Sequence, residues 1–314
     1  MKALRDYYGE ALLKYGGMDE NVVVLDADLA GSTKSGVFGK EFPKRFFNVG
    51  IAEANLVGMT AGLAAVGKIP FANTFAVFLT TNGLLSARTF GSYSELNMKL
   101  IGAYGGVSDS YDGPTHHALE DIAVMRSLAN FEVLVASDGN QVDWLVKHAI
   151  EVEKPMYIRL SREATRMIYG VNEEFEVGKA KTLRNGQDAT IIAYGIMVER
   201  ALDAAEVLKS KHNIDVRVVD MWTVKPIDSD AILAAAKDTN AIITVEDHNI
   251  IGGLGSAVAE VLTSSFAVVP QGFVGIQDTH AECGPFGELM ERYCLGVDNI
   301  VEKTLETLKT NNQI

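Results

Sequence analysis

Short apolar segments of strand character alternate with longer segments of helical periodicity along the whole chain, and this alternation constrains the fold more than any other feature. The expected strands lie at 21–25, 45–49, 68–73, 99–104, 131–136 and 156–160, and again at 189–194, 216–220, 241–245 and 273–276. Strands that alternate with helices form mainly parallel sheets with helices on both faces. The sequence therefore predicts an α/β protein.

Two domains of this kind are expected, because 314 residues are enough for two domains of ordinary size. The periodic pattern is lost between about 163 and 187, where polar residues become frequent, as they do in segments that join domains. We expect a first domain over 1–165, a linker over 166–187 and a second, smaller domain over 188–314. The helices of the second domain are expected near 197–211, 228–237, 253–264 and 284–309.

Charge and composition argue against several classes of protein. The formal net charge of -13 disfavours binding to nucleic acid or anionic lipid. No apolar run approaches the length of a membrane span, and the charged, amphipathic start of the chain is unlike a secretory signal. Cys283 and Cys294 lack metal-type spacing. We therefore expect a reduced, cytoplasmic protein that binds neither nucleic acid nor membrane.

One carboxylate stands at the start of the most apolar helical pattern in the chain. The helix opens at 51–53, after a turn at Gly50, and it has almost no polar residue for several turns after Glu53. Such a helix is expected to be buried, and Gly58 and Gly62 leave a track along which another backbone can approach. A lone buried carboxylate must be paired, stabilised by the helix dipole or held protonated. Glu53 is therefore either a dipole-complementing residue or a catalytic acid that faces a ligand.

Polar and aromatic residues follow several of the expected strands. Asp28 and Ser32 come after the strand at 21–25, and Arg162 comes after the strand at 156–160. In open α/β sheets, loops at the carboxyl ends of strands line the ligand crevice, although turn chemistry alone also places such residues there. Phe75 and Phe78, three apart on one helix face, fit either a core or the wall of a cofactor pocket.

The segment at 105–120 is the most polar and least periodic part of the first half. Its DGPTH sequence at 112–116 leads into His116 and His117, just before an expected helix. Imidazoles donate, accept or ligate at neutral pH. A zinc site is the alternative, but no further Cys or His stands at ligand spacing, so we expect no metal site in this chain. The GGLG sequence at 252–255 lacks the spacing of a phosphate loop, and we expect tight helix–strand packing there.

Taken together, these motifs resemble the second half of the transketolase family, in which a pyrimidine-binding domain precedes a C-terminal domain. The resemblance extends over essentially the whole chain. The matching motifs are GIAE at 50–53, TFxxF at 74–78, DGPTH at 112–116 with ALEDIA at 118–123, LSR at 160–162, and VEDH at 245–248 with GGLG at 252–255.

The resemblance implies a thiamine diphosphate enzyme that moves a two-carbon ketol unit from a ketose to an aldose. Glu53 matches the glutamate that bonds the N1′ nitrogen of the cofactor's aminopyrimidine and favours its imino tautomer, so that the thiazolium C2 proton can be removed. Phe75 and Phe78 match the aromatic wall around the aminopyrimidine, and Asp28 matches the acidic residue near the thiazolium. The cofactor carries the carbanion chemistry in such enzymes.

The resemblance also implies a substrate site. Asp112 and His116 match the residues that contact the oxygens of the donor sugar, His116 being a second catalytic candidate. Three further residues match positions that bind the sugar phosphate in the family, namely Arg5, Ser32 and Arg162. Tyr104 stands where the family commonly has a substrate-binding His, His117 where it often has Gln, and Asp109-Ser-Tyr111 replaces a glycine-rich connection. These departures leave open a branched or sulfonated sugar, or another acceptor.

The chain lacks a GDG-type loop with a downstream Asn, which would hold the cofactor's diphosphate through Mg²⁺. The resemblance therefore implies a split transketolase, in which an N-terminal, diphosphate-binding subunit supplies the Mg²⁺ ligands. The implied assembly is a dimer of heterodimers with active sites at the interfaces.

Three rival interpretations remain. The β subunit of a 2-oxoacid dehydrogenase E1 component has a similar length and catalytic glutamate, but the DGPTH sequence at 112–116 is unlike that family. A deoxyxylulose-phosphate synthase half is another candidate, although those enzymes are normally one chain. A regulatory or structural α/β subunit that has lost catalysis is the non-enzyme interpretation. The joint retention of six residues argues against it, namely Glu53, Phe75, Phe78, Asp112, His116 and Arg162.

Overall fold

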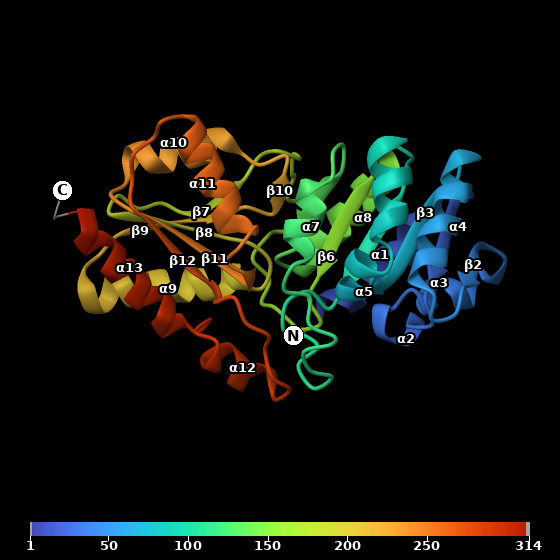
Figure 1. Cartoon of the computed structure of the whole chain (residues 1–314), viewed down its shortest axis with the longest axis horizontal. Helices are drawn as coiled ribbons and strands as arrows, with labels where there is room; N and C mark the ends of the chain where they lie inside the picture. Colours follow the sequence, from blue (N-terminus) through green and yellow to red (C-terminus); the bar gives the residue numbers. More distant parts are fainter. Residues whose placement is uncertain (1, 312–314) are drawn as a thin grey trace.

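Two sheets lie side by side in the computed structural model, which describes residues 2–311 (Figure 1). The first sheet has the strand order β10 (Thr223–Lys225), β5 (Glu132–Val135), β6 (Met156–Leu160), β4 (Lys99–Ala103), β3 (Ile69–Phe75), β1 (Val22–Asp26), β2 (Phe46–Asn48). The second has the order β12 (Gln271–Ile276), β11 (Ile242–Asn249), β8 (Ala189–Ala193), β9 (Val216–Asp220), β7 (Lys181–Arg184). This confirms the expected fold class.

Nearly all strand pairs are parallel. Among the described strands, only β10 against β5 and β7 against β9 run antiparallel. The central strands β1, β4, β5, β6 and β8 are buried at every residue. Parallel sheets that helices cover on both sides need such continuous apolar strands, which is why the sequence shows apolar runs rather than alternation.

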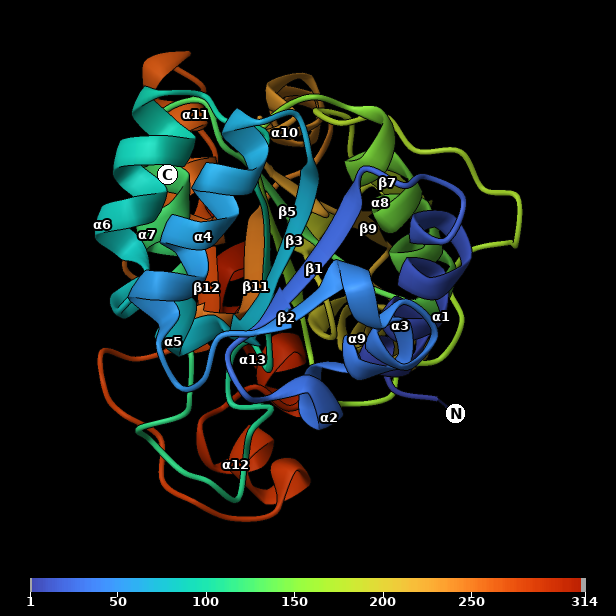
Figure 2. The same ribbon diagram turned by 90° about the vertical axis from the view of Figure 1, so that its right-hand side faces the viewer.

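Helices cover both faces of each sheet (Figure 2). On one face of the first sheet, α1 (Leu4–Gly16) packs against α3 (Gly36–Glu41) and α8 (Gly139–Glu151). The other face carries α4 (Glu53–Ala65), α5 (Ala76–Thr81), α6 (Leu84–Ser86), the π-helix η2 (Ala87–Tyr93) and α7 (Asp121–Ser127). Two short elements lie between β1 and β2 in the chain, namely α2 (Ala30–Thr33) and the 3₁₀ turn η1 (Pro43–Arg45).

In the second domain, α9 (Met197–His212) packs against α13 (Val297–Asn311), and α10 (Ser229–Asp238) packs against α11 (Leu254–Ser264). The single helix expected over 284–309 is wrong, since α12 (Phe286–Arg292) ends before α13 begins. Cys294, with φ of 58°, lies between the two helices, and a left-handed residue cannot continue a right-handed helix.

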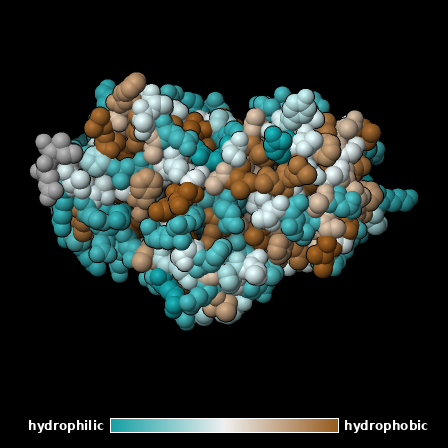
Figure 3. Space-filling model, in the orientation of Figure 1, coloured by the Kyte–Doolittle hydropathy of each residue, from teal (hydrophilic) through white to brown (hydrophobic). Residues whose placement is uncertain are grey.

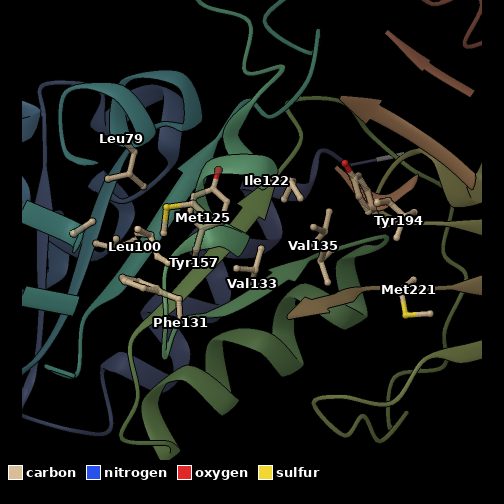
Figure 4. Packing of buried hydrophobic residues seen from close by; sticks show 14 of the residues in the cluster. Leu79, Leu100, Ile122, Met125, Phe131, Val133, Val135, Tyr157, Tyr194 and Met221 are labelled. Atoms are coloured by element: carbon tan, nitrogen blue, oxygen red, sulfur yellow. The ribbon is translucent and has the colours of Figure 1, made fainter. Parts of the chain in front are cut away.

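The junction between the domains is more interwoven than a simple linker. The strand β7 lies within the segment 166–187, and it pairs with β9 of the second sheet. The strand β10 lies beyond residue 188 but pairs with β5 of the first sheet. One hydrophobic cluster continues across the junction, from Phe131 and Val135 to Tyr194 and Met221 (Figure 4). The division at 165 and 188 stays a prediction.

The helix α4 is not buried all round, and the prediction that it would be is wrong. Leu56, Val57 and Ala61 are buried against the sheet, whereas Met59 is 37% exposed. A Cβ atom added at Gly58 or Gly62 would have no atom of the described chain within 4 Å. The sheet covers only one side of the helix, so its apolar outer side faces away from this chain. Elsewhere, hydrophobic residues also reach the surface of the first domain near the junction (Figure 3).

Candidate active site

The carboxyl ends of four neighbouring strands bring the predicted site residues to one edge of the first sheet. The strands β6, β4, β3 and β1 are adjacent and parallel, so their carboxyl ends meet at the same edge. Arg162, Tyr104, Phe75 and Asp28 stand at or just after these four ends. This is where ligands bind in open α/β sheets.

Four rings form an aromatic wall at this edge. Phe75, at the end of β3, stacks on Tyr104 with 4.3 Å between ring centroids. Phe78, one turn into α5, lies 6.0 Å from Phe75. His116 meets Phe78 edge-on at 5.1 Å and Phe75 at 6.2 Å. The wall thus offers flat apolar surface with one imidazole beside it, an arrangement suited to a planar ring.

Glu53 lies at the N-terminus of α4 with its side chain nearly enclosed, since the residue is only 6% exposed. The Asn82 amide donates a 3.1 Å hydrogen bond to Glu53 Oε2. Asn82 follows α5 directly, and its backbone N–H bonds the carbonyl of Phe78. The helix dipole and the amide therefore both stabilise the carboxylate and hold it close to α5, the helix that carries Phe78 of the aromatic wall.

Two guanidinium groups approach the Tyr104 ring. The Cζ atoms of Arg5 and Arg162 lie 5.3 and 5.4 Å from its centroid. Arg5 also donates to the Tyr104 hydroxyl and, at 3.4 Å, to the carbonyl of Ser32. Cations over a tyrosine ring are held by its quadrupole. The sequence-predicted group of Arg5, Ser32 and Arg162 is thus gathered around Tyr104.

Two residues at the strand ends have left-handed backbone conformations. Asp28 has φ of 65° and Tyr104 has φ of 62°. Such conformations are uncommon for residues other than glycine, and they persist where the surrounding structure fixes them, often at functional sites. The Asp28 carboxylate is exposed and accepts a 2.8 Å hydrogen bond from Asn48 at the end of β2. Asp28 is therefore held beside the segment that leads into Glu53.

The polar loop at 105–120 folds over this edge. Asp109 is fully buried and accepts a 3.1 Å bond from Arg162, and its backbone carbonyl accepts the N–H of Asp112. Asp112 itself is exposed, at the turn before Gly113. The Thr115 hydroxyl lies 2.9 Å from His116 Nδ1. Asp112 and His116 thus stand on the solvent side of the loop, whereas Asp109 lies beneath them.

Sequence reasoning missed Asn82 and gave Asp109 no role. Asn82 could have been noticed as a polar residue at the end of the apolar helix α5. Its contact with Glu53, however, depends on the tertiary fold. His117 is buried, and desolvation lowers the pKa of its imidazole, so the ring is neutral at pH 7. Both of its ring nitrogens are buried and have no hydrogen-bond partner among the described residues.

The GGLG segment packs as expected. A Cβ atom at Gly253 would collide with the Glu246 carboxylate, which accepts the N–H groups of Leu254 and Gly255. The start of α11 is therefore occupied by a side chain of the protein itself. Within residues 2–311, no three His, Cys, Asp or Glu side chains gather as metal ligands would. No helix there combines the length and hydrophobicity needed to cross a bilayer.

Both halves of the chain match models of known protein families. Residues 1–167 match the family model "Transketolase, pyrimidine binding domain", and residues 178–300 match "Transketolase, C-terminal domain". A putative transketolase C-terminal section of Methanocaldococcus jannaschii is 42% identical over 98% of this chain and 97% of its own length. A 6-deoxy-6-sulfo-D-fructose transketolase subunit of a Clostridium species is 39% identical over 98% of this chain and 95% of its own length.

Two further relatives are a longer protein, of which this chain matches about half, and a protein of solved structure. Human transketolase is 39% identical over 96% of this chain, which corresponds to only 48% of the human protein. A solved structure described as a split gene transketolase, inactive beta4 tetramer, is 43% identical and superimposes with a TM-score of 0.90 over 98% of this chain and 99% of that one.

Proposed function

Because the chain belongs to the transketolase family, we propose that it is one subunit of a thiamine diphosphate-dependent ketol transferase. The transferred group would be a two-carbon ketol unit, the donor a ketose or ketose phosphate, and the acceptor an aldose. The observation that carries the proposal is the position of Glu53, a nearly enclosed carboxylate joined through Asn82 to the helix that bears Phe78 of the aromatic wall.

The residues present suit the aminopyrimidine half of this cofactor. A flat ring packed against Phe75 and Phe78 would lie near a carboxylate that has, among the described residues, a single side-chain hydrogen bond, from Asn82 to one of its oxygens. Glu53 would share a hydrogen bond and a proton with the N1′ ring nitrogen, as a positioned carboxyl group can. Thiamine diphosphate, when bound, supplies the carbanion chemistry that breaks and forms carbon–carbon bonds.

The other site residues would bind and orient the sugar. Asp112 and His116, on the solvent side of the loop, would bond the oxygens of the donor. Arg5 and Arg162, beside Tyr104, would receive an anionic group at the far end of the sugar. Asp28, near the start of the segment that leads to Glu53, would lie toward the thiazolium.

We propose that a second, diphosphate-binding subunit completes the site and carries the Mg²⁺ ligands. The support is the open outer side of α4, where Met59 is exposed and Gly58 and Gly62 offer a flat track. Small residues on an apolar helix face let another backbone approach closely. The relatives described as sections or subunits of transketolase favour the same arrangement. We propose a dimer of such heterodimers.

The test is co-purification with the diphosphate-binding subunit, followed by a ketol-transfer assay that depends on thiamine diphosphate and Mg²⁺. A panel of sugar phosphates, branched sugars and sulfonated sugars would serve as donors. Glu53→Gln should abolish transfer without unfolding the protein, and Glu302→Gln, an exposed position of α13, is the matched control. Undiminished transfer by Glu53→Gln would overturn the proposal, and acyl transfer to lipoamide would favour a dehydrogenase component instead.

A further inference from the structure

One carboxylate of the polar loop at 105–120 is already paired with an arginine of the proposed anion site. Arg162 Nη1 donates to Asp109 Oδ1 at 3.1 Å. The Asp109 side chain is fully buried, whereas the Arg162 side chain is 34% exposed. The carboxylate therefore holds the guanidinium from the protein side, and the outer side of the guanidinium remains open to solvent. An anion that arrives from solvent meets an arginine whose charge is already paired.

Asp109 stands in surroundings that make its negative charge costly. Its second oxygen, Oδ2, is buried and has no hydrogen-bond partner among the described residues. Asp112 adds a like charge nearby, and the guanidinium of Arg162 and the imidazole of His116 face it. Burial, followed by the charge of Asp112, raises the pKa of Asp109 to about 6. The pairing with Arg162 is what keeps this carboxyl group ionised near neutral pH.

The second arginine of the site has a carboxylate neighbour too. Arg5 flanks Tyr104 together with Arg162, and its Nε atom is buried without a partner among the described residues. Glu163 faces both arginines, and burial raises the pKa of its carboxyl group. Two guanidinium groups are therefore accompanied by two carboxylates. The net charge of the site, and with it the attraction of an anion, depends on which of the two carboxylates are ionised.

We propose that Asp109 is a built-in counter-anion with which an anionic substrate group must compete for the charge of Arg162, so that Asp109 sets both the affinity and the pH dependence of anion binding. The inference rests on the proposed function in one respect, namely that Arg5 and Arg162 receive the anionic end of the sugar. An ionised Asp109 competes for the guanidinium, whereas a protonated Asp109 does not. Anion affinity then falls as the pH rises through the range in which Asp109 loses its proton.

The experiment measures the binding of inorganic sulfate to the full chain by isothermal titration calorimetry, because sulfate keeps its charge over the pH range used. In Asp109→Asn the competing charge is gone and the side-chain shape is kept. At about pH 8 this variant should bind sulfate roughly fivefold more tightly than wild type, the order expected for a partly exposed ion pair. At about pH 5 the two affinities should converge, because wild-type Asp109 is then protonated. Comparing the ratio of the two affinities at each pH cancels the titration of Glu163, which both proteins share.

Three variants make the outcomes distinguishable. Arg162→Ala should lose most sulfate binding, and Asp215→Asn, which alters the 3.3 Å pair with Arg184 in the second domain, should leave it unchanged. If Asp109→Asn weakens sulfate binding, or matches wild type at both pH values, the competition is refuted and Asp109 merely orients Arg162. If instead Arg162→Ala binds sulfate as wild type does, the proposed anion site itself fails. Thermal unfolding of each variant verifies that it is folded.

Discussion

Arg159 of the first domain donates to Asp247 of the second domain with 2.6 Å between Nη1 and Oδ1, and both side chains are buried. The pair lies directly beneath the polar loop at 105–120, because a Cβ atom at Gly106 would collide with the Asp247 carboxylate. Arg159 also donates to the carbonyl of Ala118, and Ala118 exchanges two backbone hydrogen bonds with Gly106. Both ends of the loop thus rest on one ion pair that joins the domains.

Asp247→Ala should therefore be strongly destabilising. Removing one partner of a buried pair leaves an uncompensated charge, and the expected loss is about 3–5 kcal/mol in the free energy of unfolding. Arg159 keeps Asp121 as a second partner at 2.8 Å, so the loss should fall at the lower end. Urea denaturation measures it. Glu282→Ala, in an exposed pair with Arg292, is the control and should cost less than about 1 kcal/mol. Equal losses would show that Asp247 is not a buried ionic partner.

Asn82→Ala should slow ketol transfer in the complex with the partner subunit. The variant removes the only side-chain hydrogen bond that Glu53 receives among the described residues. A hydrogen bond to a charged group contributes about 1.5–3 kcal/mol, so a fall of at least roughly tenfold in kcat is expected. Asn240→Ala, at an exposed position of the second domain, is the control. A rate within twofold or so of wild type would mean that Asn82 does not help to position Glu53.

Phe78→Ala should weaken the retention of thiamine diphosphate by the assembled enzyme. Phe78 is half-buried and meets both Phe75 and His116, so its loss opens the aromatic wall. Aromatic pairs contribute about 0.5–1.5 kcal/mol beyond the area they bury, which corresponds to an affinity change of roughly three- to tenfold. Fluorescence titration with the cofactor measures the change. Phe266→Ala, which removes a ring that is 91% exposed, should leave the affinity unaltered.

Gly62→Ala separates the stability of the chain from its assembly. In the isolated chain the new methyl group has space, and the helix gains up to about 1 kcal/mol from the better helix former. In the assembly, the same methyl group should hinder a partner that lies along the glycine track of α4. We expect a higher midpoint of thermal unfolding and weaker association by sedimentation velocity. Association as strong as that of wild type would place the partner surface elsewhere.

Asp220→Asn should change how the stability depends on pH. Burial raises the pKa of Asp220 to about 7, so the ionised form is disfavoured in the folded state. A carboxyl group whose folded pKa is raised contributes stability that is present at low pH and is lost as the pH rises through about 7. The variant stays neutral and can still accept from Tyr169, which bonds Asp220 at 2.6 Å. Relative to wild type, it should therefore gain stability between pH 5 and about pH 8.

The comparison uses urea denaturation of both proteins at each pH, so that shifts of other groups cancel. Glu306→Gln, at a side chain 65% exposed, is the control and should follow the wild-type curve. A constant difference between Asp220→Asn and wild type across this range would show that Asp220 does not titrate there.

The pattern of apolar strands and helices was enough to predict two parallel α/β sheets and the order of most elements. Such patterns are local, since each strand needs an apolar run and each helix needs its period and its ends. In α8, for example, the Asp138 cap accepts from the N–H of Gln141, and Lys154-Pro155 follows the end of the helix. The strands β7 and β10 were not predicted, because each is short and forms only by pairing at a sheet edge.

The candidate site, too, was predicted from the sequence only in part. Their place at strand ends identified Asp28, Ser32 and Arg162 as candidates, because the carboxyl ends of parallel strands meet at one edge. Glu53, Phe75 and Phe78 were identified from helical patterns and from the resemblance to the family. Their assigned roles stay predictions. Nothing local in the sequence relates Asn82 to Glu53, 29 positions away, or turns the buried carboxylate of Asp109 toward Arg162.

By itself the sequence determined the class of fold, the family and the set of candidate residues, because these depend on composition, periodicity and motifs along the chain. Only the tertiary structure decided which charges meet, which side of α4 faces outward, and that Asp247 of the second domain supports the polar loop at 105–120 of the first. The physical reason is that ion pairing and burial depend on distances between segments far apart in the sequence, and those distances are set when the sheets and helices pack together.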